Sequence, residues 1–257
     1  MNRLISDGNK EKGVRYDDTI VALLKKYEIN RKPIEVSFRD LVRQINNTDR
    51  ATHLIHTYPA KLLMHIPFFF LNNSVFSKPG ALVLDPFSGS GTVLLEALLA
   101  NRRAIGADSN PLARLISEVK TNKYDPEILR QNIVTIKKGI KKKRRTPVPN
   151  VVNVDFWFLP HIKQQLANIL AAIKDIENDK YRKFFLVCFS NCIKKVSLAD
   201  PRVSVPVKLK AKQYTKNHPL RKEAENKLES LTSLNVEKKF FEIVNASIKK
   251  KKKCNVL

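Results

Sequence analysis

Residues 81–108 combine apolar runs, glycines and acids in an order that few folds accommodate. The run Ala81 to Asp85 (ALVLD) predicts a buried parallel strand, because four apolar residues lead into an acid at its carboxyl end. Next comes the turn PFSGSG, whose glycines can adopt positive φ angles and let a ligand approach the backbone. A helical pattern, TVLLEALLAN, and a second strand, Arg103 to Asp108, complete the unit. This order predicts an α/β fold, the nucleotide-binding half of a doubly wound sheet.

The two acids at the strand ends discriminate between ligand classes. Asp85 and Asp108 are separated by about the 20 residues that lie between a glycine turn and a ribose-binding acid in such units. A dinucleotide would favour a third glycine in the turn, and Asp85 would repel its pyrophosphate. S-adenosylmethionine fits better, because its cationic end favours a carboxylate and its ribose hydroxyls can donate to Asp108. The alternative is a glycine turn in an ordinary βαβ unit that binds nothing.

The chain carries a large excess of positive charge. Its 48 Lys and Arg residues against 24 Asp and Glu give a formal net charge of +24, which indicates an anionic partner, nucleic acid first. Base bias in the coding DNA is the alternative explanation. Three basic runs, Lys137 to Arg145, Lys208 to Lys216 and Lys249 to Lys253, could neutralise phosphates without reading sequence. Lysines at helix ends are also often merely solvated.

Composition and periodicity divide the chain into an N-terminal helical segment (1–50), an apolar core (51–125) and a mainly helical, basic region (126–257). The apolar stretch Ile66 to Phe76 is expected to be buried core, and Asp200 to Tyr214 an extended arm. Helices are expected at Asp18 to Ile29, at Ser37 to Ile45 (capped by Ser37 with Asp40 three residues on), from Asp125 to a point before Pro147, and at His161 to Asn178, Tyr181 to Ser197 and Lys227 to Lys253.

Several protein classes are disfavoured. The amino terminus lacks the apolar core of a secretory signal, and no apolar run approaches the roughly 20 residues that span a bilayer, so a cytoplasmic protein without membrane contact is expected. Three cysteines cannot build a disulfide framework. Cys188 and Cys192 share a helix face, but no further Cys or His lies near them in sequence, so we expect core packing and no metal site.

Two segments carry a family resemblance. DPFSGSGT (Asp85 to Thr92) resembles the first signature of the DNA amino-methyltransferases, which methylate cytosine N4 or adenine N6. THLIHTYPAKLLMHIP (Thr52 to Pro67) resembles the family's other cofactor-side motif, His-x-Tyr-Pro-Ala-Lys. The resemblance implies a partial Rossmann-like methyltransferase sheet with a helical basic insertion. It also implies S-adenosylmethionine as cofactor, double-stranded DNA as substrate, and cytosine N4 as the favoured target.

The resemblance also assigns residues. It places His56, Tyr58, Pro59 and Lys61 at the methionine end of the cofactor, although a packed tyrosine at the start of a helix is the alternative for this segment. Asp108 would bind the ribose hydroxyls, and Phe87 would close the pocket. The complete implied cofactor-binding set is His56, Tyr58, Pro59, Lys61, Asp85, Pro86, Phe87, Gly89, Ser90, Gly91, Thr92, Asp108, Ser109 and Asn110.

The family's second site has no counterpart in these residues. That site is a Ser, Asp or Asn followed by Pro-Pro and an aromatic residue, which accepts hydrogen bonds from the target amine and stacks on the extruded base. The 257 residues contain no Pro-Pro pair, and in Asp200-Pro201-Arg202-Val203 a guanidinium would neutralise the acid. We therefore expect an open strand edge at Ala81 to Asp85 and a complementing polypeptide, a truncated gene, or a portion of a longer chain. An RNA amino-methyltransferase and a non-catalytic DNA-binding subunit are the alternatives.

Overall fold

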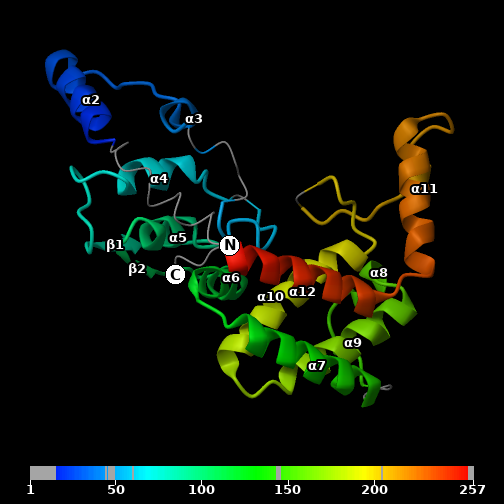
Figure 1. Ribbon diagram of the computed structural model, residues 1–257. Helices are drawn as coiled ribbons and strands as arrows, with labels where there is room; N and C mark the ends of the chain where they lie inside the picture. Colours follow the sequence, from blue (N-terminus) through cyan, green and yellow to red (C-terminus); the bar gives the residue numbers. More distant parts are fainter. Residues whose placement is uncertain are drawn as a thin grey trace. The chain divides into compact units, whose positions relative to one another are not determined.

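The computed structural model describes residues 16–43, 45, 50–59, 61–142, 146–203 and 205–253, and the chain divides into two compact units (Figure 1). One unit comprises Met1–Lys123 and Lys249–Leu257, and the other comprises Tyr124–Ile248. The amino-terminal residues 1–15, the basic residues 143–145 and the segment CNVL with Cys254 lie outside the described residues. Among those described, no helix has the length and apolar character to cross a bilayer.

The first unit begins with helical segments. Its elements are α2 (Asp17–Asn30), α3 (Phe38–Leu41), α4 (His65–Leu71), β1 (Leu82–Asp85), α5 (Thr92–Leu99), β2 (Arg103–Gly106) and α6 (Pro111–Thr121). Helix α2 confirms the expectation, as does the cap on α3, where Ser37 Oγ accepts a hydrogen bond of 3.4 Å from the Asp40 backbone N–H. The prediction that this helix extends to Ile45 is wrong, because α3 ends at Leu41. Val42 leaves the helical conformation and is fully buried beside Phe69 instead.

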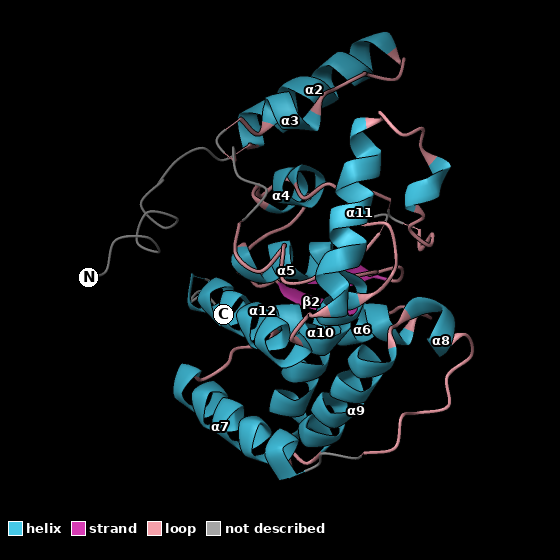
Figure 2. Cartoon of the chain, turned by 90° about the vertical axis from the view of Figure 1, so that its right-hand side faces the viewer, coloured by secondary structure: helices cyan, strands magenta, loops and turns pink. Residues whose placement is uncertain are grey.

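The two strands form a parallel pair with α5 as the crossover between them (Figure 2). Leu82 pairs with Arg103 and Asp85 with Gly106, so both carboxyl ends lie at the same edge. The α/β class and the parallel pairing are thereby confirmed. A doubly wound, Rossmann-like sheet stays a prediction, because the described residues form only these two strands.

The sheet is packed on one face only. Val83 and Ala104 contact a cluster formed by Leu71, Ala97 and Ala100 of α4 and α5. On the opposite face Leu82, Leu84 and Ile105 are 54%, 67% and 53% exposed. The expected burial of the first strand is therefore wrong for this face. Successive residues of a strand point to opposite sides, and among the described residues this cluster covers one side alone.

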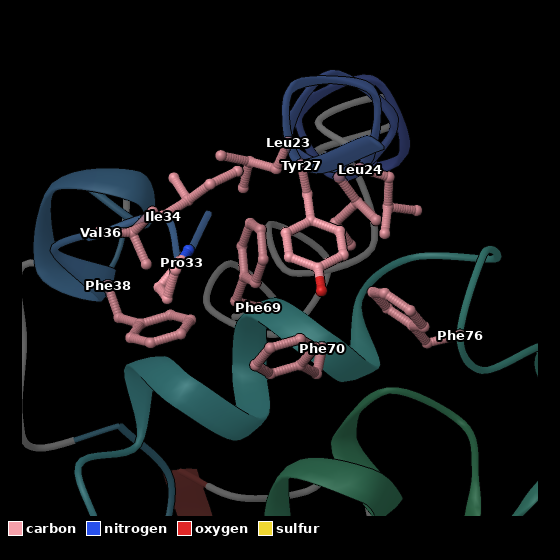
Figure 3. Close-up of a pocket in the computed structure, with 11 residues that line it drawn as sticks. Leu23, Leu24, Tyr27, Pro33, Ile34, Val36, Phe38, Phe69, Phe70 and Phe76 are labelled. Carbon is pink, nitrogen blue, oxygen red and sulfur yellow. The ribbon is translucent and has the colours of Figure 1, made fainter. Parts of the chain in front are cut away.

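The aromatic stretch around α4 is also less buried than expected. Phe69 and Leu71 are buried, but Phe70, Val75 and Phe76 are 38%, 43% and 55% exposed. Phe70 and Phe76 border a cavity of about 340 Å³ between α2, the segment after it and α4 (Figure 3). The cavity is lined by Ile20, Leu23, Leu24, Tyr27, Pro33, Ile34, Val36, Phe38, Phe69, Phe70 and Phe76.

The second unit is built mainly from helices. Its elements are α7 (Pro126–Lys142), α8 (Val154–Trp157), α9 (Pro160–Lys174), α10 (Asp179–Val196), the short 3-10 helix η1 (Ala211–Gln213), α11 (Pro219–Thr232) and α12 (Val236–Lys253), of which residues 236–248 belong to this unit. The three helices expected between residues 125 and 197 are confirmed within a few residues. Cys188 and Cys192 are buried in α10, and burial raises the pKa of each thiol to about 12, so the expected core role is confirmed.

The prediction of a single helix from Lys227 to Lys253 is wrong, because two helices, α11 and α12, occupy this region. The break follows Thr232, and Asn235 starts the second helix by accepting a hydrogen bond of 2.9 Å from the Lys238 backbone N–H. The Val236 backbone N–H donates to Gln165 Oε1 at 2.8 Å. In the region of the expected arm, an isolated antiparallel bridge joins Ala199 to Lys208.

Candidate functional site

The glycine turn between β1 and α5 is fastened to the end of β2. The backbone N–H of Ser88 donates to the Ala107 carbonyl at 2.9 Å, and the backbone N–H of Gly89 donates to Asp108 Oδ2 at 2.8 Å. Gly89 and Gly91 have φ angles of +49° and +74°, which confirms that the turn uses the left-handed conformation available to glycine. The turn is therefore held in a defined shape at the carboxyl edge of the sheet.

The two glycines of the turn differ in their surroundings. A Cβ atom added to Gly91 would lie 2.4 Å from Ser117 Oγ, so the absence of a side chain allows α6 to pack against the turn. A Cβ atom added to Gly89 would have no atom within 4 Å. Gly91 thus serves packing, whereas Gly89 borders open space in which a ligand can meet the backbone.

The two predicted acids lie at the same edge. Asp85 ends β1, and its Oδ1 accepts a hydrogen bond of 3.2 Å from the Phe87 backbone N–H. Asp108 follows β2, and its Oδ1 accepts one of 2.8 Å from the Asn110 backbone N–H. The Gly89 backbone N–H donates to the other oxygen, Oδ2. Each Asp108 oxygen therefore accepts one backbone hydrogen bond and keeps a lone pair that can accept a second hydrogen bond.

The upstream motif reaches the same edge through Tyr58. Its hydroxyl accepts a hydrogen bond of 3.2 Å from Asn110 Nδ2, across 52 positions of sequence. Asn110 also starts α6, because its Oδ1 accepts a 2.9 Å hydrogen bond from the Leu112 backbone N–H. His56 is buried, and burial lowers its pKa to about 4, so it is neutral at physiological pH. Of the implied set, Pro59, Pro86, Ser109 and Asn110 are exposed, and Phe87 is 88% exposed.

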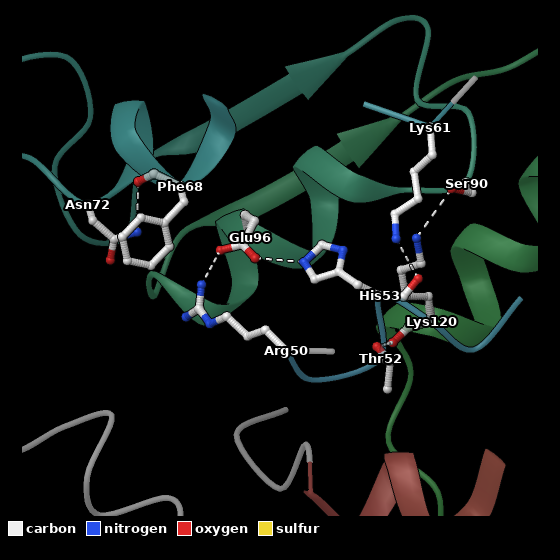
Figure 4. Close-up of polar contacts among 9 residues, drawn as sticks. All are labelled: Arg50, Thr52, His53, Lys61, Phe68, Asn72, Ser90, Glu96 and Lys120. Atoms are coloured by element: carbon white, nitrogen blue, oxygen red, sulfur yellow. Dashed lines mark hydrogen bonds and ion pairs between the residues drawn. The ribbon is translucent and has the colours of Figure 1, made fainter. Parts of the chain in front are cut away.

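Behind the turn lies a buried ionic network that the sequence analysis missed (Figure 4). Glu96 of α5 is fully buried, and its two carboxylate oxygens accept hydrogen bonds of 2.5 Å from Arg50 Nη1 and 2.7 Å from His53 Nε2. The Arg50 guanidinium also lies 4.6 Å from the centroid of the Phe68 ring. The available signal was Glu96 itself, the single acid within the apolar run of α5.

Lys120 is the second residue that the sequence analysis missed. It lies near the end of α6, is 1% exposed, and directs its ammonium toward the turn, 3.3 Å from Ser90 Oγ. Burial, together with the charges of Lys61 and Lys251, lowers the pKa of Lys120 to about 7. No sequence signal separated this lysine from the many solvated ones, because its burial depends on packing against distant segments.

Part of the C-terminal lysine run binds the first unit's own backbone. Lys250 Nζ donates to the Leu54 carbonyl at 2.7 Å. Lys251 Nζ donates to the carbonyls of Lys120 and Asn122 at 2.8 and 2.6 Å, at the C-terminal end of α6, where a cation is favourable. Two of the five lysines in this run therefore have a structural role.

The nearest approach to the absent tetrapeptide is neutralised, as expected. Arg202 donates to both carboxylate oxygens of Asp200, at 2.8 Å from Nε and 2.5 Å from Nη2. Hydrogen bonds from Arg202 lower the pKa of Asp200. The carboxylate is thus occupied by a guanidinium from the same segment rather than open to a target amine.

Residues 24–118, from α2 into α6, match the DNA methylase family N6_N4_Mtase. The chain is related to the DNA amino-methyltransferases. Among individual proteins, it is 30% identical over 161 residues to the Type II methyltransferase M.MvaI of Kocuria varians, and 35% identical over 92 residues to the Type II methyltransferase M.MjaII of Methanocaldococcus jannaschii.

This relationship to the DNA amino-methyltransferases covers only part of each protein. The M.MvaI match takes in 59% of this chain and 36% of M.MvaI, and the M.MjaII match takes in 36% of this chain and 17% of M.MjaII. The chain thus spans about a third or less of the curated relatives it matches. No solved structure matches it. The glycine turn, both acids and the segment from His56 to Lys61 lie inside the family match, whereas Lys120 lies two residues beyond it.

Proposed function

We propose that this chain is the S-adenosylmethionine-binding portion of a site-specific DNA methyltransferase that acts on an exocyclic amino group. The observation that carries the proposal is the juxtaposition at one sheet edge of the open Gly89 backbone with the carboxylates of Asp85 and Asp108. The match to DNA methylases over the same residues supports it.

The residues at this edge fit such a cofactor. Gly89 leaves room for a ligand, and the Asp108 carboxylate can accept ribose hydroxyls beside its two backbone donors. Asp85 supplies negative charge for the cationic amino and sulfonium groups of the methionine end. When bound, the cofactor supplies an electrophilic methyl group. The chain's own part is to bind and orient it, with Tyr58 and Asn110 bordering the same space and Phe87 as the proposed cover.

Catalysis requires a second set of groups. The amine of cytosine or adenine is a weak nucleophile, so a polar side chain and a backbone carbonyl must accept its hydrogen bonds while an aromatic ring holds the base. The 257 residues lack the Pro-Pro tetrapeptide that does this in the family. We propose that a complementing polypeptide supplies it, with cytosine N4 as the favoured target. The exposed apolar face of Leu82, Leu84 and Ile105 offers a surface for such a partner.

Calorimetric titration with S-adenosylmethionine tests the cofactor proposal. Wild type is expected to bind, and Asp85→Ala to bind at least about tenfold more weakly, because an interaction with a charged group is lost. Glu28→Ala, which removes an exposed acid of α2, is the matched control and should bind like wild type. Failure of wild type to bind the cofactor, or unchanged binding by Asp85→Ala, would reject the assignment.

Methyl transfer tests the completed enzyme. The chain is co-expressed with the product of the neighbouring reading frame, supplied with S-adenosylmethionine bearing a tritiated methyl group, and offered double-stranded DNA or transfer RNA. Nucleosides from the digested product then distinguish N4-methylcytosine from N6-methyladenine. Label in RNA alone would favour an RNA methyltransferase. Tight DNA binding without cofactor binding would instead favour a non-catalytic subunit.

A further inference from the structure

The ammonium of Lys120 is buried next to the glycine turn. A lysine this deeply buried normally has a carboxylate partner, because burying an unpaired charge is costly. Among the described residues, the ammonium of Lys120 makes one hydrogen bond, to Ser90 Oγ at the long distance of 3.3 Å. Ser90 is itself buried and belongs to the glycine turn. Within the part of the chain that the structure describes, the hydrogen-bond partner of this cation is thus a hydroxyl of the glycine turn and not a carboxylate.

Two acids of this unit already have other donors. Glu96 accepts hydrogen bonds from Arg50 and His53, and Asp108 accepts the backbone N–H groups of Gly89 and Asn110. The remaining close charges are positive, since both Lys61 and Lys251 act on Lys120 electrostatically. Positive charge is therefore concentrated behind the turn without an equal number of carboxylates.

Lys61, the lysine of the upstream motif, is less suited than Lys120 to bind an anionic group of a ligand. Its Nζ donates to the His53 carbonyl at 2.7 Å, so one of its donors is used to hold the chain (Figure 4). Lys120 and Ser90, by contrast, meet beside the first turn of α5. That eight-residue helix begins at Gly91 without a side-chain cap, and the N–H groups of its first turn favour an anion.

We propose that Lys120, assisted by Ser90 at the start of α5, is the binding partner for the carboxylate of the cofactor's methionine end. This inference rests on the proposed function, because it names the residue that recognises one group of that cofactor. Lys120 is then a specificity-determining residue. It favours an adenosyl ligand with a free amino-acid carboxylate over one that lacks it.

The test compares two ligands that differ in this carboxylate, S-adenosylmethionine and decarboxylated S-adenosylmethionine. Calorimetry measures the Kd of each for wild type and for Lys120→Met, which keeps an unbranched apolar side chain of similar length. Lys120→Met should weaken S-adenosylmethionine binding by about tenfold or more, since a hydrogen bond between charged groups is lost. It should change the Kd of the decarboxylated ligand by less than about threefold. Lys123→Met, an exposed lysine three residues on, should behave as wild type.

A second variant makes the test independent of substitution at Lys120. Ser90→Ala should weaken S-adenosylmethionine binding by a few-fold, with a smaller effect on the decarboxylated ligand. If Lys120→Met weakens the binding of both ligands equally, the proposal is overturned, because the lysine would then stabilise the fold rather than bind the carboxylate. Unchanged binding of both would overturn it as well. Failure of wild type to bind either ligand would instead reject the cofactor assignment, a separate outcome.

Discussion

Asp108 Oδ2 accepts a hydrogen bond from the backbone N–H of Gly89 at 2.8 Å, although the two residues are 19 positions apart. Its other oxygen accepts the Asn110 N–H at the same distance. One carboxylate therefore fixes the glycine turn after β1 and the start of α6 after β2. The residue that the family resemblance assigns to the ribose also shapes the site in which the ribose would bind.

Asp108→Ala is expected to affect both stability and cofactor binding. Loss of two backbone hydrogen bonds to a charged acceptor should lower the free energy of unfolding by about 1–3 kcal/mol. Binding of S-adenosylmethionine should weaken by more than about tenfold. Urea unfolding and calorimetry measure the two effects, with the exposed Asp18→Ala as control. Wild-type affinity in Asp108→Ala would contradict the ribose assignment.

The two glycines of the turn should respond differently to alanine. Gly91→Ala places Cβ 2.4 Å from Ser117 Oγ and 3.0 Å from Ser117 Cα in a left-handed conformation, so a loss of roughly 3 kcal/mol or more in unfolding free energy is expected. Gly89→Ala meets no atom and should lose only the conformational contribution, about 1–2 kcal/mol.

Cofactor titration should affect these two variants differently from unfolding. At temperatures where both variants are folded, the ratio of lost binding free energy to lost unfolding free energy should be larger for Gly89→Ala than for Gly91→Ala. The reason is that the methyl group at position 89 projects into the open space where the cofactor would bind. Equal stability losses for the two alanines would contradict the packing described for Gly91 and Ser117.

Glu96→Gln should destabilise the first unit. The fully buried carboxylate is paired with Arg50 and His53, and its neutralisation leaves the Arg50 charge without its partner. Breaking a buried ion pair from one side typically costs about 3–5 kcal/mol. Chemical unfolding of Glu96→Gln beside Glu28→Gln, an exposed acid, measures the difference. A loss below about 1 kcal/mol would show that the network contributes little to stability.

In the absence of cofactor, Lys120→Met should raise the free energy of unfolding by an amount that depends on pH. Burial lowers the pKa of Lys120 in the folded state from 10.5 to about 7, so between these values the unfolded chain binds more protons and wild-type stability rises with pH. The cost of the buried charge is fully present below pH 7 and fades toward pH 10.5. The gain from Lys120→Met should therefore be on the order of a few kcal/mol near pH 6 and should shrink as pH rises.

Other titrating groups surround Lys120, so the comparison with wild type is made at each pH. Lys61 and Lys251 oppose its charge and Glu96 supports it, while His53 and His56 feel its charge in turn. Titrations of groups that do not interact with Lys120 cancel in the difference between the two unfolding free energies, whereas those of its charged neighbours contribute to that difference. A stability difference that does not vary between pH 6 and pH 10 would contradict the lowered pKa.

DNA binding is expected to depend on exposed lysines of the second unit. Lys210, Lys212 and Lys216 are exposed, and their simultaneous replacement by alanine should weaken binding to a non-specific duplex. The slope of log K against log salt should fall by roughly 0.9 for each phosphate that the variant no longer neutralises. Fluorescence anisotropy over a salt series measures both quantities.

A charge-matched variant separates local binding from net charge in that experiment. Replacing Lys25, Lys26 and Lys32, which are exposed in the first unit, removes the same three charges. It should leave the salt slope closer to the wild-type value. Identical effects of the two triple variants would indicate general attraction to the basic chain rather than a binding segment around Lys210.

Local patterns were sufficient to predict much of the fold. Apolar residues that recur every three or four positions marked α2, α7, α9 and α10, because residues at that spacing lie on one face of a helix. Gly89, Gly91 and the terminal acid of β1 marked the turn, because few residues adopt positive φ at low cost. The break between α11 and α12 was missed, since buried Leu231 and Val236 and a hydrogen bond to Gln165 define it.

The sequence by itself therefore determined the strand, turn and helix order and the acids at the strand ends, which are encoded by adjacent residues. Only the tertiary structure decided which charges are buried together. Glu96 meets His53 across 43 positions, and Lys120 is placed behind Ser90 across 30. It also decided that one face of the β1–β2 pair stays exposed. Burial depends on segments that are distant along the chain, and burial disfavours the charged form of Lys120 and so lowers its pKa to about 7.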